Sequence, residues 1–163
     1  MMSIIVITVI EFLIGSFMHF LYDIFPNVLT SLIAPVNESI FEHLKLALYP
    51  MLIVSFIVLY YYKKLNTKSL TALFFGIITS IMSIVLIYYF YHDGLGIESL
   101  ILDIILLFVS IFIGNAVAYC VYQHNLEFNI YLIVGLFVGL ILLFSVWTYF
   151  PPALPLFMDP SLQ

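Results

Sequence analysis

Five apolar stretches, each about 20 residues long, make up most of this chain and constrain its fold more than any other feature. A stretch of this length crosses the hydrocarbon layer as one α-helix, because a helix satisfies its backbone hydrogen bonds internally. We therefore predict an all-α fold, a polytopic membrane helix bundle of about five transmembrane helices, with residues 1–163 forming a single integral membrane domain. The predicted spans lie near 3–23, 44–62, 69–91, 97–121 and 129–150.

The composition fits a protein whose main solvent is lipid. The chain is 65% hydrophobic and 8% charged, whereas a soluble domain carries about 25% charged residues. Its formal net charge of −5 and its lack of a basic run exclude the usual electrostatic footprint of a nucleic-acid-binding protein. The sequence predicts a multi-pass protein of the cell (cytoplasmic) membrane with the lipid bilayer as its partner; it identifies no protein partner.

The positions of the lysines predict the orientation of the bundle. Lys63, Lys64 and Lys68 all lie in the link between the second and third spans. Because lysine-rich loops stay in the cytoplasm, we predict a cytoplasmic N-terminus and an extracytoplasmic C-terminus. The link 24–43 is then extracytoplasmic. Its first part, residues 24–36, is too short to span the membrane and too apolar for water, so we expect an interfacial or re-entrant link.

Ionisable side chains concentrate at the predicted outer end of the bundle. Residues 38–45 alone contain Glu38, Glu42, His43 and Lys45. Polar groups are costly in hydrocarbon unless they are paired, hydrated or bound to a metal. Further ionisable residues fall at the same end under the predicted topology: His19, Asp23, His92, Asp93, Asp103 and Asp159. This uneven distribution is the strongest functional signal in the sequence.

These residue types suit a divalent metal such as zinc, which takes imidazole and carboxylate ligands. His19 and Asp23 are spaced i, i+4 and would share one face of a continuous helix. A zinc-bound water can attack an ester, amide or phosphate with a carboxylate as general base. We predict metal ligands at His19, Asp23, His43 and Asp103, and catalytic roles for Glu38, Glu42 and Lys45.

Each of these residues also has a purely structural interpretation. Ser39 and Glu42 have the spacing of a capping box, which would begin a helix after Ser39. If the helix begins near Asn37 instead, Glu38, Glu42 and Lys45 form one stripe along it. Lys45 can reach the headgroups or pair with either glutamate. His19 and Asp23 can form a hydrogen-bonded structural pair. The sequence leaves these alternatives open.

Three segments resemble a known family. The segment Pro35-Val36-Asn37-Glu38-Ser39-Ile40-Phe41-Glu42-His43-Leu44-Lys45-Leu46 is similar to the Pro-Val-Asn-Glu-Ser…Glu-His-Leu-Lys-Leu signature of a family of small bacterial and archaeal integral membrane proteins of unknown function. His19-Phe20-Leu21-Tyr22-Asp23 and the run from Pro151 to Pro160 resemble the pattern of the same family. The resemblance implies a common fold and supplies no mechanism.

Three functions remain open from the sequence. The first is a hydrolase or transferase that acts on a lipid or lipid-linked substrate at the outer polar site; a lipid-linked or small-molecule ligand is the possible partner. The second is a small transporter, or a transporter subunit, that uses Glu11 and Asp103 within its spans. The third is a non-catalytic membrane assembly partner. Two structural expectations accompany them: Asn115 forms a hydrogen bond between helices, and the proline-rich tail folds back along the outer surface or lies in the headgroups.

Overall fold

The computed structural model describes residues 3–159, and within them the chain is helical with no β-strand. The predicted all-α fold with five long apolar helices is confirmed. The segments long and apolar enough to cross a membrane are Ile4–Ile24, Ile40–Tyr61, Thr67–Gly94, Leu100–Gln123 and Ile130–Tyr149.

Several of these segments consist of two helices in succession. The first combines α1 (Ile4–Met18) with α2 (Leu21–Ile24), and the second combines α4 (Ile40–His43) with α5 (Lys45–Tyr61). The third is α6 (Thr67–Tyr89) with the π-helical turn η1 (Phe90–Gly94). The last two are α7 (Leu100–Gln123) and α8 (Ile130–Tyr149), and two short elements remain: α3 (Val28–Ile33) and the 3-10 turn η2 (Pro155–Phe157).

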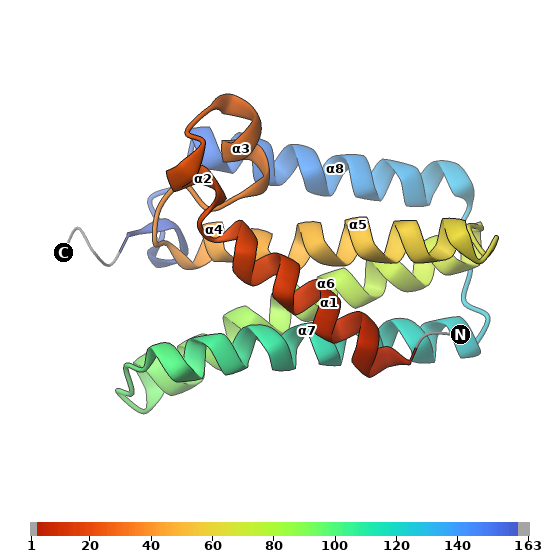
Figure 1. The fold of residues 1–163 in the computed structure, drawn as a ribbon, viewed down its shortest axis with the longest axis horizontal. Coiled ribbons are helices and arrows are strands. Elements are labelled where there is room, and N and C mark those ends of the chain that lie inside the picture. Colours follow the sequence, from red (N-terminus) through yellow and green to blue (C-terminus); the bar gives the residue numbers. More distant parts are fainter. Residues whose placement is uncertain (1–2, 160–163) are drawn as a thin grey trace.

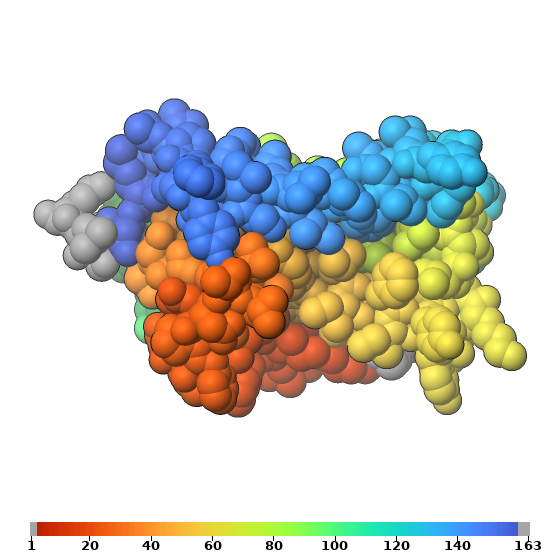
Figure 2. All heavy atoms as spheres, turned by 90° about the horizontal axis from the view of Figure 1, so that it is seen from above, coloured from red at the N-terminus to blue at the C-terminus, as the bar shows by residue number. Residues whose placement is uncertain are grey.

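The long helices run roughly side by side, with α6 and α7 paired along their length and α1 crossing α5 and α7 obliquely (Figure 1). The short helices α2, α3 and α4 gather at one end of the bundle, whereas the α5–α6 and α7–α8 links lie at the opposite end. Figure 2 shows the segment 24–43 packed beside α8. We call the end of the bundle that carries α2, α3 and α4 the short-helix end.

The crossing of α1 and α5 depends on a glycine and a proline. Pro50 lies inside α5 and has no N–H to donate to the carbonyl of Leu46. That carbonyl faces Gly15 of α1, where an added Cβ would collide with it. The absence of a side chain at Gly15 thus allows α1 to approach the part of α5 that precedes the polar end of the bundle.

The tail after α8 folds back onto α4. The ring of Phe157 in η2 lies 4.5 Å from that of Phe41, measured between centroids, and 5.4 Å from that of Trp147. The backbone N–H of Glu38 donates to Oδ2 of Asp159 at 3.3 Å. The tail therefore packs against α4 and the loop that precedes it.

Candidate functional site

Two histidines and one glutamate from separate parts of the chain meet at the short-helix end of the bundle. His19 follows α1, His43 ends α4, and Glu38 lies in the loop before α4. The Nε2 atoms of the histidines are 3.2 Å apart. Oε2 of Glu38 lies 3.4 Å from Nε2 of His43 and 3.9 Å from Nε2 of His19. The three ligand atoms lie within 4.8 Å of one another, close enough to share one ion. We call these three residues the histidine cluster.

The orientation of His43 leaves one ring nitrogen available to a ligand. Its Nδ1 lies 2.9 Å from the carbonyl oxygen of Ser39. Because a carbonyl can only accept a hydrogen bond, we assign the proton of the neutral ring to Nδ1. Nε2 then presents its lone pair toward His19 and Glu38. A backbone carbonyl in this position commonly fixes the tautomer of metal-binding histidines.

Local sequence explains how α4 presents His43. Ser39 is the N-cap residue, and its hydroxyl accepts a hydrogen bond from the backbone N–H of Glu42 at 3.3 Å. The helix therefore begins after Ser39, and not near Asn37. The second bond of a capping box is absent, because Oδ1 of Asn37 accepts the Ser39 N–H at 3.0 Å instead. The carboxylate of Glu42 is thus free to turn into the protein.

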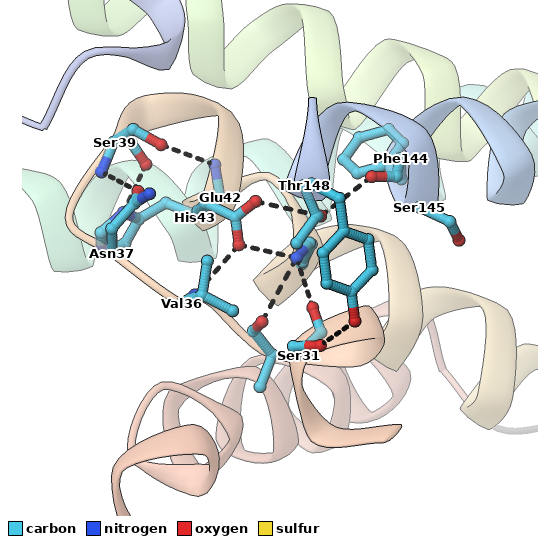
Figure 3. Close-up of polar contacts among 12 residues, drawn as sticks. Ser31, Val36, Asn37, Ser39, Glu42, His43, Phe144, Ser145 and Thr148 are labelled. Carbon is cyan, nitrogen blue, oxygen red and sulfur yellow. Dashed lines mark hydrogen bonds and ion pairs between the residues drawn. The ribbon is translucent and has the colours of Figure 1, made fainter. Parts of the chain in front are cut away.

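Glu42 and Lys45 form a buried ion pair. Figure 3 shows the Glu42 carboxylate turned toward Thr148. Nζ of Lys45 lies 2.6 Å from Oε2 of Glu42. The same Oε2 accepts the backbone N–H of Val36 at 3.0 Å, and Oε1 accepts the hydroxyl of Thr148 at 3.1 Å. Lys45 is 0% exposed and Glu42 is 2% exposed. The pair therefore connects the segment 24–43 to both α5 and α8.

The remaining hydrogen-bonding capacity of Lys45 holds the backbone of the loop. Nζ also donates to the carbonyl of Ser31 at 2.8 Å and to that of Ala34 at 3.3 Å. Its three donors are therefore matched by three acceptors, as a buried ammonium requires. The hydroxyl of Ser31 in turn lies 2.7 Å from that of Tyr149. This network positions the loop and offers no open face to a substrate.

A cavity of about 400 Å³ opens beside the histidine cluster and extends between α1, α5, α6 and α7. Its wall includes all three residues of the cluster, together with Asp103 and several apolar side chains. The hydroxyl of Tyr91 donates a hydrogen bond to Asp103. We call this the histidine-end cavity. Its two carboxylates, Glu38 and Asp103, can both reach its interior.

The structure divides the predicted site residues into three groups. His19 and His43 lie together, and Asp103 lies on the wall of the same cavity. Asp23 is exposed and belongs neither to the histidine cluster nor to the cavity lining. Of the residues predicted to be catalytic, Glu38 joins the histidines, whereas Glu42 and Lys45 form the buried pair.

Glu38 and Glu42 are both predicted from the sequence to be catalytic. In the structure, Glu38 faces the two histidines, whereas Glu42 faces Lys45. The capping signal of Ser39 was the feature that could have separated them. A residue before the N-cap lies in the loop, whereas the N3 residue belongs to the first helical turn.

Comparison with known proteins gives a family and no activity. A family model described as a family of unknown function (DUF6512) matches residues 2–162. The chain belongs to this family. Neither curated proteins nor solved structures gave a match.

Proposed function

We propose that this member of DUF6512 is a single integral membrane domain that binds a divalent metal ion through the histidine cluster and acts on a lipid-linked substrate. The observation that carries the proposal is the convergence of His19, Glu38 and His43 on one point beside a cavity. Two imidazoles and one carboxylate are a ligand set that zinc accepts in hydrolytic enzymes. Three protein ligands leave a coordination position for water or substrate.

The cavity supports a substrate with an apolar part. Its wall is formed largely by apolar side chains such as Phe12, Leu106 and Leu107, with the polar groups gathered at the cluster and at Asp103. An acyl or isoprenoid chain would lie among the apolar side chains while its ester or phosphate group approached the metal. Bound zinc would supply Lewis acidity and lower the pKa of its water. Asp103, the other carboxylate on the wall, is our candidate for the proton-accepting group.

The metal prediction is tested on the purified full-length protein. We expect about one zinc or similar ion per chain by elemental analysis, since a three-ligand site holds one ion. His43→Ala should weaken zinc binding by more than the roughly 10- to 100-fold that loss of an outer hydrogen-bond partner costs, because it removes a direct ligand. Calorimetric titration with zinc measures the change. His124→Ala is the matched control, because His124 is exposed and lies at the opposite end of the bundle.

Two results would contradict the metal site. The first is a protein that binds no divalent ion after titration. The second is binding that His43→Ala leaves unchanged. The enzymatic part of the proposal is tested separately by measuring turnover of lipid-linked esters and phosphates with zinc-loaded and zinc-free protein. Turnover that is equal in both would refute a reaction that depends on the metal, and turnover that is absent in both would refute the enzyme; either result leaves the binding site standing.

We propose the orientation that the lysines predict, with the histidine cluster outside. Lys63 and Lys64 lie in the α5–α6 link and Lys68 in the first turn of α6, at the end opposite to the cluster. Positive loops favour the cytoplasmic side. The α6–α7 link, which contains Glu98, lies at the other end from this lysine group and is extracytoplasmic in this orientation.

Single cysteines test the orientation in intact cells. In a Cys120→Ser background, we expect Glu98→Cys to react with a membrane-impermeant maleimide without lysis. Asn66→Cys, in the link at the lysine end, should react after lysis. Both positions are exposed, so accessibility on each side is not limited by packing. The reverse labelling pattern would place the histidine cluster in the cytoplasm and overturn the proposed orientation.

A further inference from the structure

A second polar cluster lies in the middle of the bundle, around Glu11 of α1. The Glu11 side chain is 0% exposed. Its Oε2 accepts a hydrogen bond from Nδ2 of Asn115 at 2.6 Å, and its Oε1 accepts one from the hydroxyl of Ser55 at 3.1 Å. Nδ2 of Asn115 also donates to the hydroxyl of Thr8 at 3.0 Å. Helices α1, α5 and α7 thus each contribute to one buried carboxylate site.

This site lies between two cavities formed by the same four helices. Besides the histidine-end cavity, a cavity of about 250 Å³ opens at the opposite end, between α1, α5, α6 and α7, and we call it the lysine-end cavity. Along α1, the lysine-end cavity is lined by Ile4 and Ile7, whereas the histidine-end cavity is lined by Phe12, Ser16 and His19. Glu11 falls in the short interval between the two.

The charge of Glu11 is not balanced by a cationic side chain. The salt bridges formed among residues 3–159 do not include Glu11. The groups bonded to it are Ser55 on α5 and Asn115 on α7, and Thr8 on α1 is bonded to Asn115; none of the three is charged. A lone carboxylate deep in a membrane helix is strongly disfavoured, and it is characteristic of proton and ion pathways. A bound proton is the smallest species that removes the charge.

Other titratable groups line the two cavities. The lysine-end cavity carries Lys64, Tyr62, Tyr119 and Tyr122. The histidine-end cavity carries His19, Glu38, His43, Tyr88 and Asp103. Glu11 is therefore the single carboxyl group, among the described residues, that the structure places between them.

We propose that Glu11 holds a proton that exchanges with the solvent through the lysine-end cavity. The route is assigned by the two side chains that bond to the carboxyl group, because Ser55 and Asn115 both line this cavity and neither lines the other. In the protonated acid, the Ser55 hydroxyl turns away from the Glu11 oxygen to which it donates in the structure. Its oxygen then accepts the carboxyl proton, and the hydroxyl passes its own proton to water in the cavity. Glu11 becomes a carboxylate and Ser55 is unchanged. This proton site does not depend on the proposed metal site.

Infrared spectroscopy of the full-length protein in lipid nanodiscs tests whether Glu11 is protonated. We expect a carbonyl stretching band of a protonated carboxylic acid at neutral pH that disappears in Glu11→Gln. Glu98→Gln, which makes the same change in an exposed link, should retain the band. Absence of the band in the unsubstituted protein, or its persistence in Glu11→Gln, would overturn the proposal.

Deuterium exchange tests the route. Transfer to heavy water should shift the Glu11 band, and filling the lysine-end cavity with Val58→Phe should slow this shift several-fold. Ile104→Phe adds a ring to the histidine-end cavity and is the matched control. Ser55→Ala should also slow exchange while it leaves the cavity open, so a folding defect of one variant does not decide the result. Exchange slowed by Ile104→Phe alone would assign the route to the other cavity.

Discussion

Replacing Lys45 with methionine is expected to lower the free energy of unfolding by about 3–5 kcal/mol, the usual cost of removing one partner from a buried ion pair. Methionine keeps most of the apolar stem and removes the ammonium group. The substitution leaves the Glu42 carboxylate without its cation and two backbone carbonyls, of Ser31 and Ala34, without their donor. Denaturation of the purified protein in mixed micelles measures the loss. Lys63→Met, at an exposed lysine, is the matched control.

The double variant Glu42→Gln/Lys45→Met separates charge from packing. It removes both charges, so its cost in unfolding free energy should be clearly smaller than the sum of the costs of the two single substitutions.

The single substitutions should also loosen the segment 24–43, since Lys45 joins the backbone of this segment to α5. Proteolysis within residues 24–38 reports that loosening. A Lys45→Met protein as stable as Lys63→Met would show that this pair does not hold the loop.

The long helices could be predicted from the sequence because each one follows from a local property. A stretch of about 20 apolar residues has few alternatives to a membrane-spanning helix. For Asn115, a local property of the sequence also predicted a contact between helices. An amide inside a predicted span needs a partner on another helix, and the structure supplies Glu11 and Thr8.

Which polar residues join the histidine cluster and which form the buried ion pair depends on tertiary contacts. A local sequence pattern does not contain those contacts. Glu42 turns inward partly because Thr148, on the last long helix, donates to it. Asp23 depends on the same kind of context. Its i, i+4 relation to His19 assumes a continuous helix, whereas α1 ends at Met18 and α2 begins at Leu21, and Asp23 does not join the histidine cluster. The sequence likewise does not contain the contacts that separate Glu38 from Glu42.

The packing of α6 against α7 also escaped sequence analysis, and it yields the second large expected effect. We expect Gly114→Ala to lower the free energy of unfolding by about 1–3 kcal/mol, the usual cost of overpacking a filled interface. A Cβ at Gly114 would lie 2.6 Å from the carbonyl oxygen of Gly76 and 2.9 Å from Cβ of Ser80. Backbone on the facing helix cannot move aside as a flexible side chain would, so the two helices must separate.

A matched control distinguishes this contact from the intrinsic preference of helices for alanine. Gly139 lies in α8, and a Cβ there would meet nothing within 4 Å. Because alanine favours a helix over glycine by about 1 kcal/mol, Gly139→Ala should be neutral or slightly stabilising in the same mixed-micelle unfolding measurement. Gly114→Val should cost more than Gly114→Ala, since it adds two further methyl groups at the closest point of approach. Equal stability of Gly114→Ala and Gly139→Ala would show that α6 and α7 do not depend on this close approach. Both cavities are bounded by these two helices, so a separated pair should also change the rate of Glu11 proton exchange.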